Sequence, residues 1–577
     1  MLSSSLHKCL LALATLPACL AATNPLHCPP LGAVLPAPHT PSTNDKVKQA
    51  VQGLDQAMGK LTASLNFSAM SISVKSVHEK VNLFSKSYTP PTVDARSATK
   101  IDSDTVFRVG SVSKLFTMLG VLKLPGIDLN DPVTKFVPEL KEVQEMAEAD
   151  GLSQFRWDDV TLGALASHLS GMGSDFATDL SNFPQPWQKL GLPAANQSLM
   201  IECAGLLGLR PCNKTDFFKS FGHHPPVAAP FTNPAYSNVA YSLLAFVIEN
   251  VSNMSYDAYM HKEVLDPLSL KHTSTGGKPP VNDSQGFIPK GDIWWGATLG
   301  FEDPAGSYYS SANDLLTLAE ALLTNKLLTP VQMHKWMKPL TSTSSTGTQL
   351  GAVWEIYRSD NLTSDQRFIE VYTKSGDLGS YHAQIVLIPD YDLVFSITLG
   401  GNETSGGMAQ EILSAITTTL LPALETAGKD EAAKTFAGTY SDNSTNSTLT
   451  LKIDDGPGLV VDKWVMHGVD VPANYHSFNA LGSMPANIPL SIRVYRTSLK
   501  SDKQWSWRAV FEVGLAAERA KHDAAVFWAK GSCVTWGSED RIVYQHKALD
   551  EFVFDVCDGT ASGVLPRIFQ TKLRRTA

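Results

Sequence analysis

The chain has 577 residues, of which 43% are hydrophobic and 9% aromatic, so it can bury a substantial core and is too long for one ordinary domain. We therefore expect two domains. The formal net charge of −9 is modest, and the absence of a basic stripe argues against nucleic acid as a partner.

The N-terminus has the pattern of a secretory signal. Lys8 precedes an apolar run over residues 9–22, and small residues around positions 19–21 offer a cleavage point. The run is too short to span a bilayer, and no later stretch reaches roughly 18 uninterrupted apolar residues, so we expect no membrane span. We assign residues 1–22 to a signal peptide and predict a secreted protein. A buried N-terminal helix is the alternative interpretation.

Ten N-x-S/T sequons also favour secretion and a glycosylated product. They begin at Asn66, Asn196, Asn213, Asn250, Asn253, Asn282, Asn361, Asn402, Asn443 and Asn446.

Cysteines indicate disulfides in an oxidising compartment. Cys9 and Cys19 fall within the signal. Of the rest, Cys203 and Cys212 flank a short loop, and Cys533 and Cys557 lie in the same terminal region. We predict these two pairs, with Cys28 left over. No C-x-x-C or H-x-x-x-H spacing indicates a metal site, and we expect no cofactor.

The first structured region is predicted to begin at Asn44. Residues 23–43, rich in Pro, Thr and Ala, form an irregular leader. From Asn44 to Leu65, apolar residues recur at steps of four and three, as in an amphipathic helix. Residues 70–74 alternate like a half-buried strand, with 81–84 as a possible partner. This order suggests a helix lying on an antiparallel sheet.

The segment from Phe107 to Thr117 is predicted to turn from an extended stretch directly into a helix. Ser111 and Lys114 are three residues apart, which places them one turn apart on the same face. Serine needs a neighbour to accept its proton, and lysine can do so when burial or another cation lowers its pKa. The first helical turn also presents N–H groups to a developing oxyanion. A surface serine beside a snorkelling lysine is the alternative for S-x-x-K alone.

The next stretch contains two further candidates. Residues 161–168 predict a short helix, and we expect His168 at its end to hydrogen-bond a backbone carbonyl rather than to act as a catalytic base. The proline-rich segment 175–232 resembles an insertion that lines or covers a site. Tyr236 then precedes an apolar helix that reaches about residue 251. It is either a proton carrier or a packing residue.

A β-rich run begins near Lys374. Residues 384–389 and 393–399 predict a hairpin turned at 389–392, followed by a helix over 407–427.

From about residue 431, short alternating segments predict an all-β domain, either a small barrel or a sandwich, without a catalytic constellation. These segments lie at 448–453, 459–461, 491–495, 509–513 and 552–556. We therefore predict domains at 44–430 and 431–577.

Three short motifs occur in this order with wide spacing. They are Ser111-Val112-Ser113-Lys114, Tyr236-Ser237-Asn238 and Lys374-Ser375-Gly376. Together they resemble the S-x-x-K, Y-x-N and K-[ST]-G motifs of the serine β-lactamase and penicillin-binding-protein superfamily. The resemblance is nearest to the branch of class C β-lactamases, D-alanyl-D-alanine peptidases and carboxylesterases. The whole chain, with its β-rich tail, looks like secreted fungal β-lactamase-like proteins.

This resemblance implies an α/β (α+β) domain in which helices flank an antiparallel sheet, with an all-helical subdomain beside it. The serine would lie at their junction. Ser111 would be the nucleophile, with Lys114 and Tyr236 as proton carriers.

The resemblance also implies supporting roles. Asn238 would orient Lys114 and contact the acyl group. Lys374, on a strand edge, would keep the potential positive, within the motif that continues through Ser375 and Gly376. The backbone N–H groups of Ser111 and Asp377 would form the oxyanion hole.

Asp377 departs from the family pattern, because the residue after K-[ST]-G is commonly small and polar. A carboxylate there would repel the carboxylate of a penicillin, unless it faces away. We expect a secreted serine hydrolase or acyltransferase that acts on a neutral or cationic ester, lactone or amide, with a small molecule as partner. A transesterase that tailors a secondary metabolite and a catalytically silent binding protein are the alternatives. The sequence does not define an oligomeric state.

Overall fold

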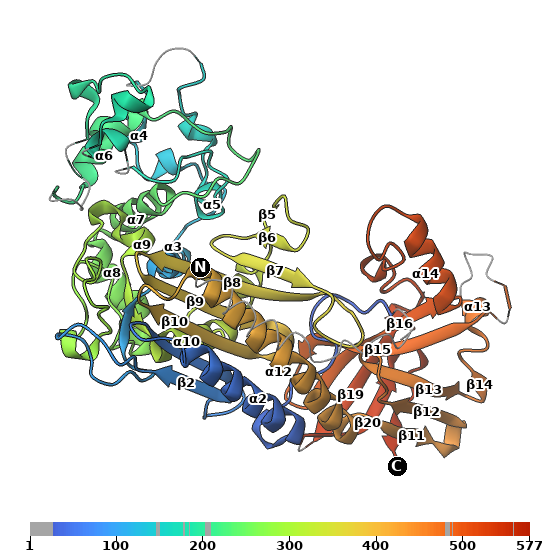
Figure 1. Ribbon diagram of the computed structural model, residues 1–577. Coiled ribbons are helices and arrows are strands. Elements are labelled where there is room, and N and C mark those ends of the chain that lie inside the picture. The colour runs from blue at the N-terminus through green and yellow to red at the C-terminus, as the bar shows by residue number, and fades with distance from the viewer. Residues whose placement is uncertain are drawn as a thin grey trace.

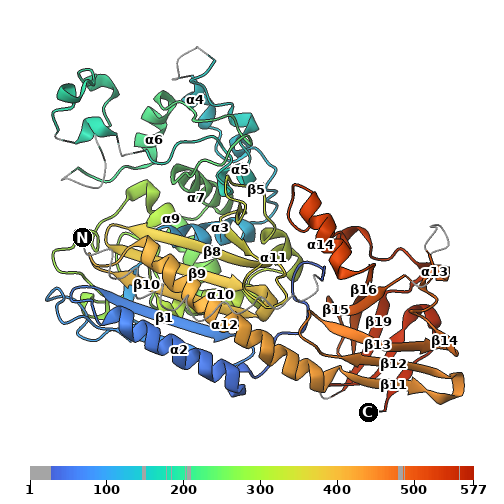
Figure 2. The ribbon, with the colours of Figure 1, turned by 45° about the vertical axis from the view of Figure 1, so that its right-hand side comes forward.

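The computed structural model describes residues 27–145, 151–176, 179–183, 185–201, 203, 209–478, 485–486, 488–557 and 559–576. The predicted signal peptide therefore lies outside the described residues. The described chain forms a mixed region of helices and strands, with a second, strand-rich region beside it (Figures 1 and 2). Among these residues, no helix has both the length and the apolar composition needed to cross a bilayer.

An antiparallel sheet of eight strands forms the centre of the larger region, in the order β2-β1-β10-β9-β8-β7-β6-β5. Strands β9 and β10 are buried along their whole length, because helices cover both faces of the sheet. They form the predicted hairpin, joined by a short turn at Pro389–Tyr391. The strands are Ala69–Ser76 (β1), Phe84–Tyr88 (β2), Thr341–Ser342 (β5), Thr348–Leu350 (β6), Glu355–Ser359 (β7), Ile369–Leu378 (β8), Tyr381–Ile388 (β9) and Leu393–Gly400 (β10).

Two details of the sheet differ from the predictions. The strand expected at 81–84 begins at Phe84, because the connection from β1 is longer and leaves Val81 exposed. Lys374 is not on a sheet edge: its strand, β8, lies between β7 and β9. The lysine is therefore enclosed by neighbouring strands.

The predicted N-terminal helix is Asp45–Thr62 (α2), and the Asn44 side chain caps it by accepting the Lys46 N–H. It lies beside Gly406–Thr435 (α12) on one face of the sheet (Figure 1). Helix α12 is longer than predicted, since Gly428 packs near the Pro36 carbonyl without ending it. It thus continues past residue 430, the predicted end of the domain.

Helices on the opposite face join the sheet to an all-helical part. Helix α10 crosses β10, β1 and β9, and α3 packs against α7 and α9 in a continuous apolar core. The helices are Ser113–Lys123 (α3), Leu140–Gln144 (α4), Leu162–Ala166 (α5), Lys214–Ser220 (α6), Val239–Ser252 (α7), Tyr256–Met260 (α8), Asp303–Gly306 (α9), Ala312–Leu323 (α10) and Pro330–Trp336 (α11).

The C-terminal sheet closes into a barrel. Its order is β12-β11-β21-β20-β19-β16-β15-β13-β14, and an additional β12–β13 pairing joins its two sides. Closure removes exposed sheet edges, which decides between the predicted barrel and sandwich. The strands are Gly438–Asp442 (β11), Ser447–Lys452 (β12), Leu459–Met466 (β13), Val469–Asp470 (β14), Leu490–Lys500 (β15), Gln504–Val513 (β16), Glu551–Cys557 (β19), Thr560–Pro566 (β20) and Leu573–Arg575 (β21); the helices are Tyr475–Phe478 (α13) and Ala516–Ala525 (α14).

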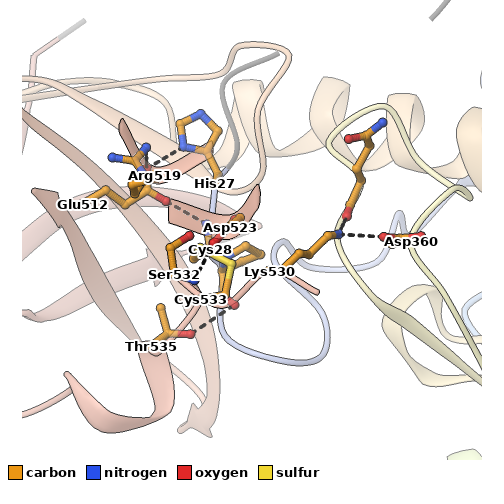
Figure 3. Close-up of a disulfide and its surroundings, with 12 residues drawn as sticks. His27, Cys28, Asp360, Glu512, Arg519, Asp523, Lys530, Ser532, Cys533 and Thr535 are labelled. Carbon is orange, nitrogen blue, oxygen red and sulfur yellow. Dashed lines mark hydrogen bonds and ion pairs between the residues drawn. A yellow bond between two sulfur atoms is a disulfide. The ribbon is translucent and has the colours of Figure 1, made fainter. Parts of the chain in front are cut away.

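The N-terminal segment is attached to the barrel region by a disulfide that the sequence did not predict. Cys28 pairs with Cys533, and Glu512 on β16 accepts the Cys28 N–H and contacts the His27 ring at 2.7 Å (Figure 3). The predicted Cys533–Cys557 pair is wrong, because proximity along the chain does not decide which cysteines meet. The predicted Cys203–Cys212 pair is present.

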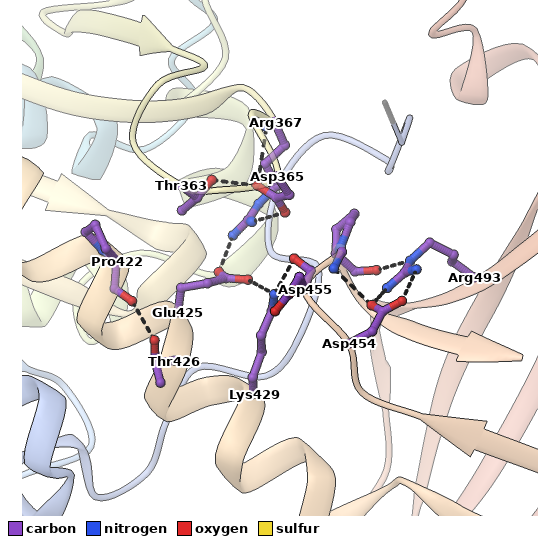
Figure 4. A network of polar contacts seen from close by, with 12 residues as sticks. Thr363, Asp365, Arg367, Pro422, Glu425, Thr426, Lys429, Asp454, Asp455 and Arg493 are labelled. Atoms are coloured by element: carbon purple, nitrogen blue, oxygen red, sulfur yellow. Dashed lines mark hydrogen bonds and ion pairs between the residues drawn. The ribbon is translucent and has the colours of Figure 1, made fainter. Parts of the chain in front are cut away.

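A network of buried charges lies where α12, β8 and the barrel meet (Figure 4). Arg367 donates to Asp365 at 2.6 Å and to Glu425 on α12 at 2.8 Å. Tyr391 also donates to Glu425, and Lys429 donates to the Asp455 carbonyl on the barrel side. We call Asp365, Arg367, Tyr391, Glu425 and Lys429 the seam network.

Candidate active site

Ser111 lies in a tight turn between a short strand and helix α3. Strand Val106–Arg108 (β3) leads into a 3-10 turn at Gly110–Val112, from which α3 begins. Gly110 has φ +50°, and a Cβ there would lie 2.5 Å from the Asp377 nitrogen. Only glycine fits this position, because both the backbone conformation and the close approach exclude a side chain. The turn leaves Ser111 half-buried and Lys114 fully buried.

The Ser111 hydroxyl receives two hydrogen bonds. Lys114 Nζ lies 2.9 Å from Ser111 Oγ, and Tyr236 Oη lies 2.6 Å from it. Lys114 also donates to Asn238 Oδ1 at 2.5 Å and to the Ala305 carbonyl at 2.7 Å. These three acceptors are neutral, and no carboxylate of the described residues forms an ion pair with this buried lysine. The structure thus brings together residues from two of the three sequence motifs.

The surroundings of Lys114 and Tyr236 lower the pKa of both groups. Burial is the largest effect on Lys114 and lowers its pKa; Tyr236 partly offsets this, and the charge of Lys374 lowers the pKa further. Burial alone would raise the pKa of Tyr236, but the charges of Lys114 and Lys374 bring it below its ordinary value. Although 42% of the Tyr236 surface is exposed, its ring lies 4.9 Å from Lys114 Nζ and 5.4 Å from Lys374 Nζ.

Lys374 is held by a carboxylate that sequence reasoning missed. Its Nζ donates to Glu355 on β7 at 2.5 Å, and Glu355 also accepts the N–H and the hydroxyl of Ser375 at 2.9 and 3.0 Å. Burial opposes the charge, but Glu355 and Tyr236 raise the pKa of Lys374 above its ordinary value. Lys374 therefore stays protonated, whereas Lys114, with its lowered pKa, loses its proton more easily.

The third motif places two backbone amides side by side. A Cβ on Gly376 would lie 2.8 Å from the Ser111 nitrogen, and one on Gly110 would meet the Asp377 nitrogen. These are the two N–H groups that the resemblance assigns to an oxyanion hole. Neutral backbone donors in such a position can stabilise charge that develops on a carbonyl oxygen.

The Asp377 carboxylate has its own partner. His382, opposite it on β9, contacts Asp377 Oδ1 at 2.5 Å. A Cβ on Gly406, at the start of α12, would lie 2.7 Å from the same oxygen, so the carboxylate faces that helix terminus. A helix N-terminus favours a negative charge, and both contacts therefore offset the charge of Asp377.

His168 is placed directly behind Tyr236. Its Nδ1 accepts the Ser237 N–H at 3.1 Å, so the expected hydrogen bond to a backbone carbonyl is wrong. The rings of His168 and Tyr236 lie 4.4 Å apart. Burial, together with the charges of Lys114 and Lys374, lowers the pKa of His168 well below its ordinary value. The imidazole is therefore neutral and cannot serve as an additional cation.

Two further acidic residues adjoin this cluster without a sequence signal. Asp175 accepts a hydrogen bond from Asn238 Nδ2 at 2.6 Å. Glu302 accepts the Phe176 N–H at 3.0 Å, and burial raises the pKa of this carboxyl group to about 7. Like Glu355, both residues lie outside the three motifs. A single acidic residue in a strand or loop does not reveal such a contact before the fold is known.

Comparison with known families agrees with the fold. The Beta-lactamase family model matches residues 71–415, more than half of the chain, and a model described as Beta-lactamase-like-like, C-terminal domain, matches residues 428–577. The chain belongs to the beta-lactamase family.

Individual relatives extend over both regions. A Beta-lactamase-like protein of Arthroderma benhamiae is 28% identical over 563 residues, which cover 92% of each chain. A probable hydrolase of Cochliobolus lunatus is 25% identical over 472 residues, 76% of this chain and 74% of that relative. Among solved structures, a penicillin-binding protein homologue from Pyrococcus abyssi aligns with a TM-score of 0.47 and 18% identity over 91% of this chain and 99% of its own.

Proposed function

We propose that this protein is a secreted serine hydrolase or acyltransferase that acts on an ester, lactone or amide through an acyl-Ser111 intermediate. The observation that carries the proposal is the pair of hydrogen bonds from Lys114 and Tyr236 to the Ser111 hydroxyl. Each donor is a group whose pKa is shifted toward neutral pH by its surroundings. Such paired carriers are what an unreactive serine hydroxyl requires.

Acylation needs one proton to leave Ser111 and one to reach the leaving group. In the proposed step, neutral Lys114 takes the Ser111 proton while Oγ attacks the carbonyl carbon. Tyr236 donates its proton to the departing oxygen or nitrogen, and the N–H groups of Ser111 and Asp377 bind the carbonyl oxygen. Asn238 fixes the position of Lys114, and Lys374 stabilises the resulting phenolate.

Deacylation follows the same path in reverse. Water or an alcohol gives a proton to the Tyr236 phenolate and attacks the acyl carbon, and Ser111 Oγ leaves with the proton stored on Lys114. Glu355 keeps the buried Lys374 protonated, so an ammonium group stays near the Tyr236 ring during both steps. No metal takes part in this scheme.

The substrate preference is proposed from Asp377. A carboxylate beside the serine disfavours a substrate that carries its own carboxylate, such as a penicillin, although His382 and the start of α12 reduce this effect. We therefore propose a neutral or cationic ester, lactone or amide.

Secretion is supported by accessibility of the modification sites. All ten sequon asparagines are exposed, and two disulfides link described cysteines. Both features suit an oxidising secretory pathway. A loss of mass after treatment with an N-glycosidase would test this part of the proposal.

Active-site labelling tests the chemistry directly. A fluorophosphonate should label the wild type and fail to label Ser111→Ala, whereas Ser345→Ala, which changes an exposed serine, should label like the wild type. Labelling with a fluorescent penicillin would contradict the substrate preference. A folded wild type that neither reagent labels would favour a silent binding protein.

A further inference from the structure

A cavity of about 540 Å³ lies beside Tyr236. Tyr236 and Glu355 belong to its wall, so it adjoins the groups that contact Ser111 and Lys374. The rest of the wall comes from His168, the loop at residues 232–234, the β5–β6 hairpin, and the apolar residues Val353 and Trp354. Its volume lies in the range of small-molecule sites, roughly 300–1,000 Å³.

The wall of this cavity is rich in neutral hydrogen-bonding groups. Four consecutive hydroxyl residues line it, and Thr232 and Asn233 line it from another loop. They are Thr341, Ser342, Thr343 and Ser344. Among the described lining residues there is no lysine or arginine, and the one carboxylate, Glu355, is already paired. The wall therefore suits a neutral, oxygen-rich ligand better than an ion.

His168 adds a ring N–H donor to the same wall. The residue is only 5% exposed, and its Nδ1 accepts the Ser237 N–H. The neutral ring must then carry its proton on Nε2. That N–H makes no hydrogen bond to any residue that the structure describes, although His168 lines the cavity. A ligand oxygen in the cavity can accept a hydrogen bond from it in place of solvent.

We infer that this cavity binds the alcohol component of the ester, and that this alcohol is a polyol or sugar. The inference rests on the proposed function and names its substrate class. In transfer, a hydroxyl of the bound polyol gives its proton to Tyr236 and its oxygen attacks the acyl carbon. The bond from that carbon to Ser111 Oγ breaks, and Oγ takes a proton from Lys114. The same cavity holds the leaving alcohol when an ester of this class is cleaved.

Acyl-acceptor kinetics test the inference. With p-nitrophenyl acetate as donor, the ratio of acetyl ester to acetate should saturate as glycerol or methyl β-D-glucopyranoside is raised. With 1-butanol the ratio should rise linearly, as for an acceptor without a site. Ser344→Val should raise the half-saturating concentration roughly three- to tenfold, the effect of one lost hydrogen bond. Ser345→Val, which changes the next, non-lining residue, should leave it at the wild-type value.

A second variant and a binding measurement distinguish failure of the cavity inference from failure of the proposed function. Ser342→Ala removes a second hydroxyl of the wall while it keeps the His168–Ser237 hydrogen bond, and it should also raise the half-saturating concentration. Ligand-observed NMR of methyl β-D-glucopyranoside with Ser111→Ala measures the cavity without chemistry. Binding that Ser344→Val weakens and Ser345→Val does not would support the inference even if no acyl-enzyme forms. An acyl-enzyme without saturation, or without a difference between Ser344→Val and Ser345→Val, would overturn it and leave the proposed function standing. Absence of both binding and acyl-enzyme would overturn both.

Discussion

The candidate active site around Ser111, here called the cleft, and the seam network both contain buried cations, but these cations have different partners. Arg367 in the seam contacts two carboxylates, Asp365 and Glu425, within 2.8 Å. Lys114 in the cleft contacts a hydroxyl, an amide oxygen and a backbone carbonyl, all neutral. Burial therefore lowers the pKa of Lys114, whereas the partners of Arg367 raise its pKa further.

The comparison shows that a buried cation can either hold neighbouring elements in place or exchange a proton. A cation that is paired with carboxylates stays charged and fixes the position of neighbouring elements. A cation that meets only neutral acceptors is stabilised less and can exchange a proton. Lys374 belongs to the first kind although it lies in the cleft, because Glu355 pairs with it. The following predictions test this division, from the largest expected effect to the smallest.

Removal of the unpaired cation should have the largest effect on activity. We expect Lys114→Met to lower kcat/KM for p-nitrophenyl acetate by roughly 10²–10⁴-fold, because the proton acceptor is lost. The melting temperature should fall moderately, because the Asn238 amide oxygen and the Ala305 carbonyl lose a buried donor. Steady-state kinetics and a thermal melt measure the two quantities. Activity within tenfold of the wild type would contradict a proton-carrying role.

Removal of a paired carboxylate should instead destabilise the fold. We expect Glu355→Gln and Glu425→Gln each to lower the free energy of unfolding by about 3–5 kcal/mol, because each leaves a buried cation with fewer partners. Denaturant unfolding measures this loss. The two variants should differ in the cleft: Glu355→Gln also lowers kcat/KM, whereas folded Glu425→Gln keeps the wild-type value. Equal losses of kcat/KM in the two variants would contradict the distinction between the two regions.

Loss of the long-range disulfide should act on stability alone. Cys28 and Cys533 are 505 positions apart, so their link constrains a very long loop in the unfolded chain. We expect Cys28→Ser to lower the free energy of unfolding by about 2–4 kcal/mol, with kcat/KM of the folded protein unchanged. Cys203→Ser, which opens a link of only 9 positions, is the matched control and should cost less. Peptide mapping that found Cys533 joined to Cys557 would contradict the described pairing.

The smallest predicted effect is a shift of the pH profile. The Lys374 charge lowers the pKa of both Lys114 and Tyr236, and neutral lysine is the form that accepts the Ser111 proton. The rate should therefore rise with pH through the apparent pKa of this coupled pair. Without the charge both pKa values rise, so Lys374→Met should move the ascending limb of kcat/KM toward higher pH by roughly one pH unit. An unmoved limb would show that Lys374 does not act through these pKa values.

Local patterns in the sequence determined much of this protein. The period of apolar residues predicted α2, and two strand-like segments around a turn predicted the β9–β10 hairpin. The family resemblance implied that Ser111, Lys114, Tyr236 and Asn238 act together, and these four residues are joined by hydrogen bonds. Such features depend on neighbours along the chain or on motifs that can be matched in order, so they could be recognised before the fold was known.

Only the tertiary structure decided which distant groups meet. Glu355 faces Lys374 because β7 and β8 pair in one register, and His168 lies behind Tyr236 because the α5 turn packs beside the start of α7. Cys28 reaches Cys533 because the N-terminal segment runs along the barrel region. The local sequence around a single Glu, His or Cys does not reveal which residue it will contact. Its chemistry is set by burial and by charges that arrive from other elements, which the folded chain alone brings together.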